Sequence, residues 1–204
     1  MKRLLIFCGI ITLTCLSCKK ENADVECNNS RFYYYESEKI VLNEVYNKGT
    51  ISFYDTLSPD AINMILKQYE NIHYTPISIR TNWIIVTIDS KSCSETELFF
   101  SEIKKDDRVS NCNKYLISDK GDDLGIYDIF TCKVKNESLI TEMNDLLLKT
   151  KTTIVEYNKY GNYYLIRVDK NSKGDALDIS NEFYESGFFE WAEPDFIANF
   201  QPYK

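Results

Sequence analysis

The order of predicted strands and helices occurs twice along this chain of 204 residues, and that repeat constrains the fold more than any single motif does. Helix starts are marked by Ser58 with Pro59 after it, and by an S-x-x-E capping box at Ser94. Apolar spacing predicts the elements of the first copy. They are a strand at 50–54, a helix at 58–69, strands at 74–80 and 83–88, a helix at 94–103 and a strand at 115–117. The second copy has the corresponding elements at residues 126–134, 139–147, 152–157, 163–169, 172–186 and 188–198. The repeat predicts an α+β fold of two tandem ferredoxin-like β-α-β-β-α-β units, each with an antiparallel sheet and its helices on one face.

The final segment, residues 173–204, carries the clearest local pattern. Ser172 is positioned to cap a helix whose inner face is predicted to carry Ala176, Ile179, Ser180 and Phe183. Gly187 follows where a helix commonly ends in the left-handed conformation, which glycine adopts without strain. The strand after it is predicted to be interrupted at Pro194, which has no N–H to donate and therefore belongs at a sheet edge or a bulge, and to resume at 196–198.

Two segments resemble the ends of the N-terminal propeptide of subtilisin-like serine peptidases (subtilases), above all those of Gram-negative anaerobes. They are FYYYESEKIVL at residues 32–42 and FYESGFFEWAEPDF at residues 183–196. The resemblance implies a ferredoxin-like fold whose four-stranded sheet docks on the peptidase, while the chain after the last strand runs through the substrate cleft. It implies that Glu193 and Asp195 cap the N-termini of two parallel enzyme helices, whose free N–H groups favour a carboxylate; a local role in the turn is the alternative. It also implies peptidase contacts by the tail residues Gln201, Pro202, Tyr203 and Lys204.

Residues 1–17 are predicted to be a lipoprotein signal peptide. Their apolar stretch, 4–16, has 13 residues, too few to span a bilayer, which requires about 20. Leu16-Ser17-Cys18 resembles a lipobox, so Cys18 is expected to carry lipid and to begin the mature chain. We expect attachment through this lipid to a membrane of the cell envelope, most simply the outer membrane, with the periplasmic or surface side left open. The mature chain is then divided into a tether, a first propeptide-like unit and a second unit with a C-terminal tail, at residues 18–30, 31–120 and 121–204.

The sequence contains little that could perform catalysis. The single histidine, His73, has no subtilase catalytic segment around it, and a histidine at a helix C-terminus is the simpler interpretation, so we expect no enzyme. Carboxylate pairs at 106–107 and 122–123 are expected to be solvated loop residues. Among the cysteines after Cys18, no close pairs of the zinc-binding kind occur, and no metal or cofactor is expected. Four cysteines remain after Cys18, namely Cys27, Cys93, Cys112 and Cys132. Two interpretations stay open: Cys93 and Cys112 form a disulfide, or the cysteines are independent buried thiols.

Charge and family resemblance together restrict the classes of function. The formal net charge is −7 with no basic stripe, which argues against a nucleic-acid partner. The first hypothesis is a membrane-anchored, stand-alone propeptide-like protein, without a catalytic domain of its own, that inhibits a partner subtilase or assists its folding. The alternative is a surface or periplasmic interaction lipoprotein, or the remnant of a longer subtilase gene, with no activity toward a peptidase.

Overall fold

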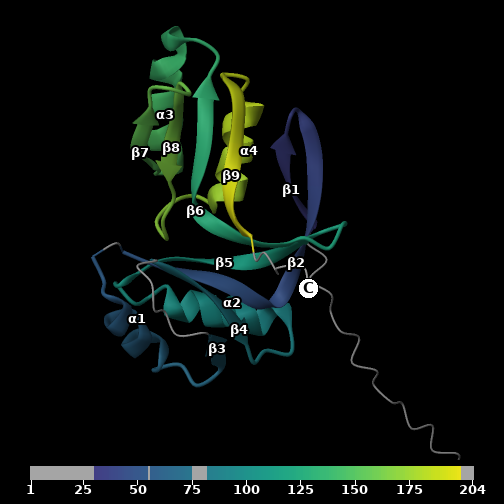
Figure 1. The fold of residues 1–204 in the computed structure, drawn as a ribbon, viewed down its shortest axis with the longest axis vertical. Coiled ribbons are helices and arrows are strands. Elements are labelled where there is room, and N and C mark those ends of the chain that lie inside the picture. The colour runs from purple at the N-terminus through teal and green to yellow at the C-terminus, as the bar shows by residue number, and fades with distance from the viewer. Residues whose placement is uncertain (1–29, 55, 75–81, 199–204) are drawn as a thin grey trace, which may run out of the picture.

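The computed structural model describes residues 30–54, 56–74 and 82–198 (Figure 1). The strands are β1 (Ser30–Tyr35), β2 (Glu38–Phe53), β3 (Ile72–Tyr74), β4 (Trp83–Ile88), β5 (Val109–Ser118), β6 (Asp123–Val134), β7 (Thr153–Asn158), β8 (Tyr163–Arg167) and β9 (Phe189–Ala198). The helices are α1 (Pro59–Leu66), α2 (Cys93–Ile103), α3 (Ile140–Thr150), with a 3-10 turn at Glu137–Leu139 before it, and α4 (Ala176–Glu185). These elements confirm the predicted α+β class.

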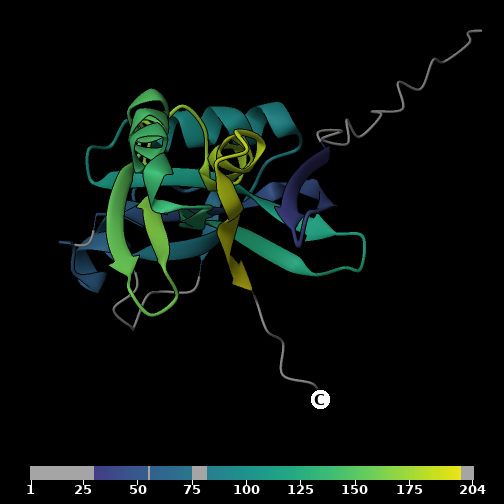
Figure 2. The ribbon, with the colours of Figure 1, turned by 90° about the horizontal axis from the view of Figure 1, so that it is seen from above.

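The strands form one antiparallel sheet in which two similar halves follow each other. Neighbouring strands run in the order β3-β4-β2-β5-β6-β8-β7, with β1 added to β2 and β9 added to β6. In the first half, β2 lies between β4 and β5, and in the second half β6 lies between β8 and β9. In each half the first strand is paired with the third and the fourth, but the separate sheets predicted for the two tandem units are one continuous sheet. Helices α3 and α4 lie on one face of the second-half strands (Figure 2).

Helix ends follow the capping chemistry in the sequence, with two changes of register. Ser58 Oγ accepts a hydrogen bond from Ala61 N at the start of α1, as predicted. The capping box of α2 begins at Ser92, two residues before the predicted serine, because Ser92 Oγ accepts from Glu95 N while the Glu95 carboxylate accepts from Lys91 N. Helix α4 is capped by Asp175, and the predicted cap Ser172 instead donates to Lys151 O.

Two strands are longer than the sequence predicts. Strand β2 begins well before the strand predicted at 50–54, and its register against β5 shifts between Val45 and Gly49. A Cβ at Gly49 would lie 2.2 Å from the Phe100 ring and 2.6 Å from Asn113 O, so glycine is what lets the strand pass under α2. Strand β9 is likewise continuous through Pro194, but the proline lies beside a register shift against β6, where the sequence pattern put a bulge.

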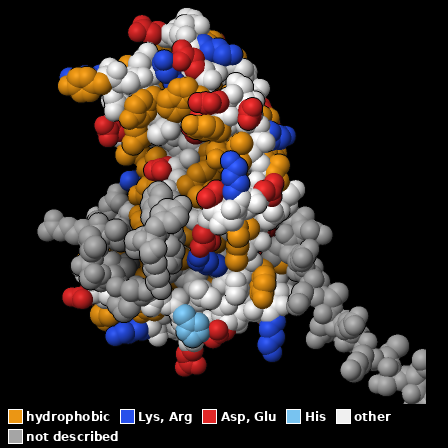
Figure 3. Space-filling model, turned by 45° about the vertical axis from the view of Figure 1, so that its right-hand side comes forward, with side chains coloured by type: hydrophobic (Ala, Val, Ile, Leu, Met, Phe, Trp, Pro, Cys, Tyr) orange, Lys and Arg blue, Asp and Glu red, His pale blue; other side chains and the backbone are white. Residues whose placement is uncertain are grey.

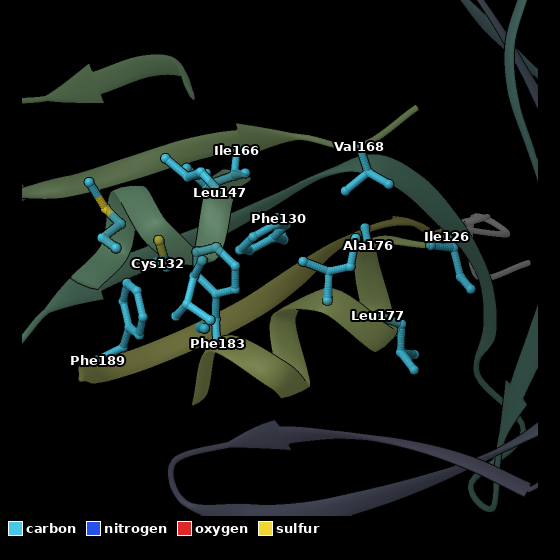
Figure 4. Close-up of a cluster of buried hydrophobic side chains, with 14 of the residues drawn as sticks. Ile126, Phe130, Cys132, Leu147, Ile166, Val168, Ala176, Leu177, Phe183 and Phe189 are labelled. Atoms are coloured by element: carbon cyan, nitrogen blue, oxygen red, sulfur yellow. The ribbon is translucent and has the colours of Figure 1, made fainter. Parts of the chain in front are cut away.

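The buried apolar residues form two clusters that correspond to the two halves. The first contains Ile51, Phe53, Ile62, Ile65 and Phe100 among others. The second surrounds Phe183, which lies with Phe130 and Phe189 between the strands and α4 (Figure 4). Leu42 and Leu116, from the predicted first unit, also belong to this second cluster, so the core of the second half includes residues from before position 121.

The β1–β2 hairpin extends away from the first half and packs on α4, which explains why residues of the predicted first unit belong to the second core cluster. Arg31, with its side chain 14% exposed, holds the Asp175 carboxylate with two hydrogen bonds of 2.6 and 2.7 Å and also bonds to Asp178. The Asn181 amide donates to Phe32 O over 2.7 Å. The helix cap of α4 and the hairpin are therefore fixed to each other by buried, charge-assisted bonds.

A buried polar cluster joins the two halves where β6 crosses β5. Asp128 is 4% exposed and accepts hydrogen bonds from Ser110 Oγ at 3.2 Å and from Asn113 Nδ2 at 3.1 Å. Thr50 Oγ1 donates to Ile126 O over 2.9 Å. Burial raises the pKa of Asp128 to about 6, against the opposing effect of these hydrogen-bond donors.

Candidate functional site

The helix-free face of strands β7, β8, β6 and β9, hereafter the open face, is the surface to which the sequence assigned a binding role. Residues of neighbouring strands lie side by side on this face. Lys133 of β6 pairs with Trp191 of β9, and Thr131 of β6 pairs with Leu165 of β8 and with Glu193 of β9. Along β9, Trp191, Glu193 and Asp195 alternate with the buried Ala192 and Pro194. Both acidic residues named by the family resemblance therefore lie on one face, beside a tryptophan.

Aromatic and charged side chains are mixed on this face. The Tyr163 and Trp191 rings are 5.8 Å apart, and Lys133 pairs with Glu190 at 2.7 Å. In Figure 3 hydrophobic side chains gather over the upper part of the molecule, where Figure 1 places the second half and the β1–β2 hairpin, with acidic and basic side chains between them. Aromatic residues are enriched at the centre of protein-binding surfaces, whereas charged residues lie mainly at their rim.

Glu193 and Asp195 have electrostatic surroundings that disfavour their charge. Burial raises the pKa of Glu193, and the nearby carboxylate of Glu36 raises it further. Burial also raises the pKa of Asp195, while a hydrogen bond from Phe196 N opposes that shift. Glu193 makes no ion pair with any residue that the structure describes. A partner that offers N–H donors or positive charge here would remove an unfavourable interaction.

The other residues assigned to the site, Cys18 and the tail Gln201, Pro202, Tyr203 and Lys204, lie outside the described residues. Lipid attachment and tail contacts therefore stay predictions. Across residues 30–54, 56–74 and 82–198, the structure has no helix that is both long and apolar enough to cross a bilayer.

The cysteines decide between the alternatives left open by their spacing. Cys93 is disulfide-bonded, whereas Cys112 and Cys132 are free and buried. A bridge between Cys93 and Cys112 is therefore wrong, and Cys27 lies outside the described residues. Burial raises the pKa of both free thiols far above the ordinary value, so they remain protonated and unreactive at neutral pH.

His73 differs in position from the sequence prediction. It lies in strand β3 rather than at a helix C-terminus, and its Nε2 is 2.9 Å from both carboxylate oxygens of Asp89. Both side chains are more than 60% exposed, at 64% and 63%, so this pair is a surface contact between neighbouring strands. In the part of the chain that the structure describes, no three His, Cys, Asp or Glu side chains are grouped to hold a metal ion.

The expected loop carboxylates have local partners instead of a shared site. The Asp106 carboxylate accepts hydrogen bonds from the backbone and guanidinium of Arg108, which lower the pKa of Asp106. Asp123 pairs with Lys48 at 2.5 Å. Both arrangements stabilise turns or strand ends.

Sequence reasoning missed the aromatic part of the site. The alternation of residues from Trp191 to Asp195 places Trp191 on the same strand face as the two acidic residues. We did not predict this, because we expected the strand to be interrupted at Pro194. Tyr34 and Glu36 come from the hairpin and Tyr184 from α4, and the packing of the hairpin on α4 brings Tyr34 and Glu36 beside Tyr184 and β9. The chain matches no protein-family model, and a search of curated proteins gives no significant match.

Proposed function

We propose that this protein binds a subtilisin-like serine peptidase through the open face, as a propeptide-like inhibitor or folding assistant, and performs no catalysis itself. In this interpretation each half is a ferredoxin-like unit, and the second half is the docking unit. Lipid on Cys18 would hold the protein at the cell envelope, and the tail after β9 would enter the substrate cleft of the peptidase.

The observation that carries the proposal is the state of Glu193. Its carboxylate is half-buried, faces the carboxylate of Glu36 and has no cationic partner among the described residues. Helix N-termini offer free N–H groups and the positive end of a helix dipole, which stabilise a carboxylate by about 0.3–2 kcal/mol. Asp195 is two residues further along the same face, so a pair of parallel helices on a partner could contact both carboxylates.

The surrounding side chains support a docking role for the same face. Trp191 and Tyr163 supply rigid aromatic area, and tryptophan and tyrosine are enriched among the residues that dominate binding energy. A sheet face of this kind can be one side of a standard interface of about 1,600 Å² in total.

The test uses soluble protein, residues 19–204, coupled to beads. Envelope extract from the source cell is labelled with a fluorophosphonate that marks active serine hydrolases and is then passed over the beads. We expect a labelled peptidase to be retained and its cleavage of a chromogenic peptide to be inhibited by the free protein.

Two variants make the result specific to the open face. Trp191→Ala should weaken inhibition about tenfold or more, because truncating a central aromatic commonly costs over 1 kcal/mol. Leu148→Ala is the matched control, since Leu148 is 79% exposed on α3, on the opposite side of the sheet. Failure to retain any labelled peptidase, or equal inhibition by both variants, would contradict the proposal.

A further inference from the structure

A pocket of about 160 Å³ lies between the turn of the β1–β2 hairpin and strand β9. Three of its lining residues are aromatic and three are acidic, and Ser37 completes the lining. The aromatic residues are Tyr34, Tyr184 and Trp191, and the acidic residues are Glu36, Glu190 and Glu193. None of the described lining residues carries a positive charge.

The aromatic walls are held in place by contacts with one another and with residues outside the pocket. Tyr34 and Tyr184 are stacked with their ring centroids 4.3 Å apart, and Tyr34 OH donates to Glu185 Oε1 over 2.9 Å. Trp191 is supported by Tyr163 on the open face, with the ring centroids 5.8 Å apart. A ligand would therefore meet aromatic surfaces that are already ordered, which lowers the entropic cost of binding.

The charges in the pocket are not balanced. Glu190 is neutralised by Lys133, at 2.7 Å. Glu193 and Glu36 have no such partner among the described residues, and the pKa of Glu193 is raised by burial first and by the Glu36 carboxylate second. The nearby cation Lys39 lies over the Phe32 ring, 3.6 Å from its centroid, and 5.8 Å from the centroid of the Tyr34 wall, but it is not part of the lining.

We propose that this pocket receives a basic side chain, arginine in preference to lysine, from the protein that docks on the open face. Carboxylates alone would form an ordinary solvated acidic surface. Aromatic walls add surfaces that attract a cation through the ring quadrupole and that also cover an apolar stem. Both features together match a long side chain with a cationic end.

Arginine is preferred because its planar guanidinium stacks on aromatic rings and can bond two carboxylates at once. Lysine offers a compact charge that is more strongly hydrated, so it gains less from the same walls. The inference rests on the proposed function in one respect, since it takes the occupant from a protein bound to the open face.

The test needs no peptidase. N-acetyl-arginine methylamide is titrated into the soluble protein, residues 19–204, while the indole N–H signal of Trp191 is followed by NMR. That signal is assigned with a Trp83→Phe variant, because the chain has two tryptophans. N-acetyl-citrulline methylamide, which has nearly the same shape without the charge, and N-acetyl-lysine methylamide serve as comparisons.

We expect a saturable shift of the Trp191 signal with the arginine compound, a weaker one with the lysine compound and none with the citrulline compound. Glu193→Gln should weaken arginine binding about fivefold, the effect of losing one partly exposed ion pair. Glu70→Gln removes one exposed acidic residue of the first half and should change nothing. The spectra themselves report whether each variant is folded.

Equal binding of the citrulline compound, or unchanged binding by Glu193→Gln, would overturn the pocket assignment. Those results would leave the capture of a peptidase by the open face unaffected. Conversely, arginine binding without any captured peptidase would uphold the pocket and refute the proposed function.

Discussion

Replacing Phe183 by alanine should remove the central side chain of the second core cluster. Phe183 is fully buried, and its ring lies 5.0 Å from both Phe130, edge to face, and Phe189 (Figure 4). Truncating a buried phenylalanine costs about 3–5 kcal/mol through lost burial and the cavity that remains. Each aromatic pair adds about 0.5–1.5 kcal/mol, so the upper part of that range is expected. Because a domain is stable by about 5–15 kcal/mol, the variant should be close to unfolding.

Urea unfolding followed by circular dichroism measures this effect. With a slope of about 2 kcal/mol per molar urea, a loss of 4 kcal/mol moves the midpoint down by about 2 M. Leu148→Ala is the control, because it truncates an apolar side chain of the same half that is 79% exposed. A midpoint for Phe183→Ala within about 0.5 M of that control would show that the ring is not packed as described and would refute the reasoning.

Three further predictions follow from the described contacts and the N-terminal sequence. Arg31→Leu should lower stability by about 1.5–3 kcal/mol, because it removes the charge-assisted hydrogen bonds from Arg31 to the largely buried Asp175 carboxylate; Arg108→Leu, which removes a guanidinium that is 47% exposed, should change the urea midpoint less. Asp128 binds its proton more tightly in the folded state, so its contribution to stability is present below pH 3.8 and is lost as the pH rises toward about 6. Asp128→Asn should abolish that part of the pH dependence of unfolding, and an unchanged profile would exclude this carboxyl as its source. Cys18→Ala should leave an unprocessed precursor without acyl label, and label that persists or moves to Cys15 would refute lipid attachment at Cys18.

Local signals in the sequence predicted the elements well wherever one short motif decides the backbone. Ser58 followed by Pro59 fixes the start of α1, and Gly187, with φ of +79°, ends α4 in the left-handed conformation. The apolar spacing also identified Ala176, Ile179 and Phe183 as inward-facing. In each case the determining residues are within a few positions of the feature, so no tertiary information is needed.

Predictions failed where a distant segment decides the outcome. Whether β2 stops or continues near Gly49 depends on the Phe100 ring, about fifty residues later in the chain, which packs over it. The cap of α4 is Asp175 and not Ser172, and Asp175 is also the residue that holds Arg31 from the hairpin. A one-dimensional pattern can rank several capping residues but cannot tell which of them also has a cationic partner 144 residues away.

The candidate site also depends on contacts between distant segments, which the sequence pattern does not show. Alternation along β9 is enough to put Trp191, Glu193 and Asp195 on one face, so the acidic part of the site was within reach of the sequence. The pocket beside it was not, because its remaining walls come from the hairpin turn near Glu36 and from Tyr184 of α4. Those segments meet because the hairpin packs on α4, where Arg31 and Asn181 bind it together with the Tyr34 ring and hydroxyl. A substitution such as Arg31→Leu should therefore weaken arginine binding without touching the pocket, which links the stability of the hairpin to recognition by the open face.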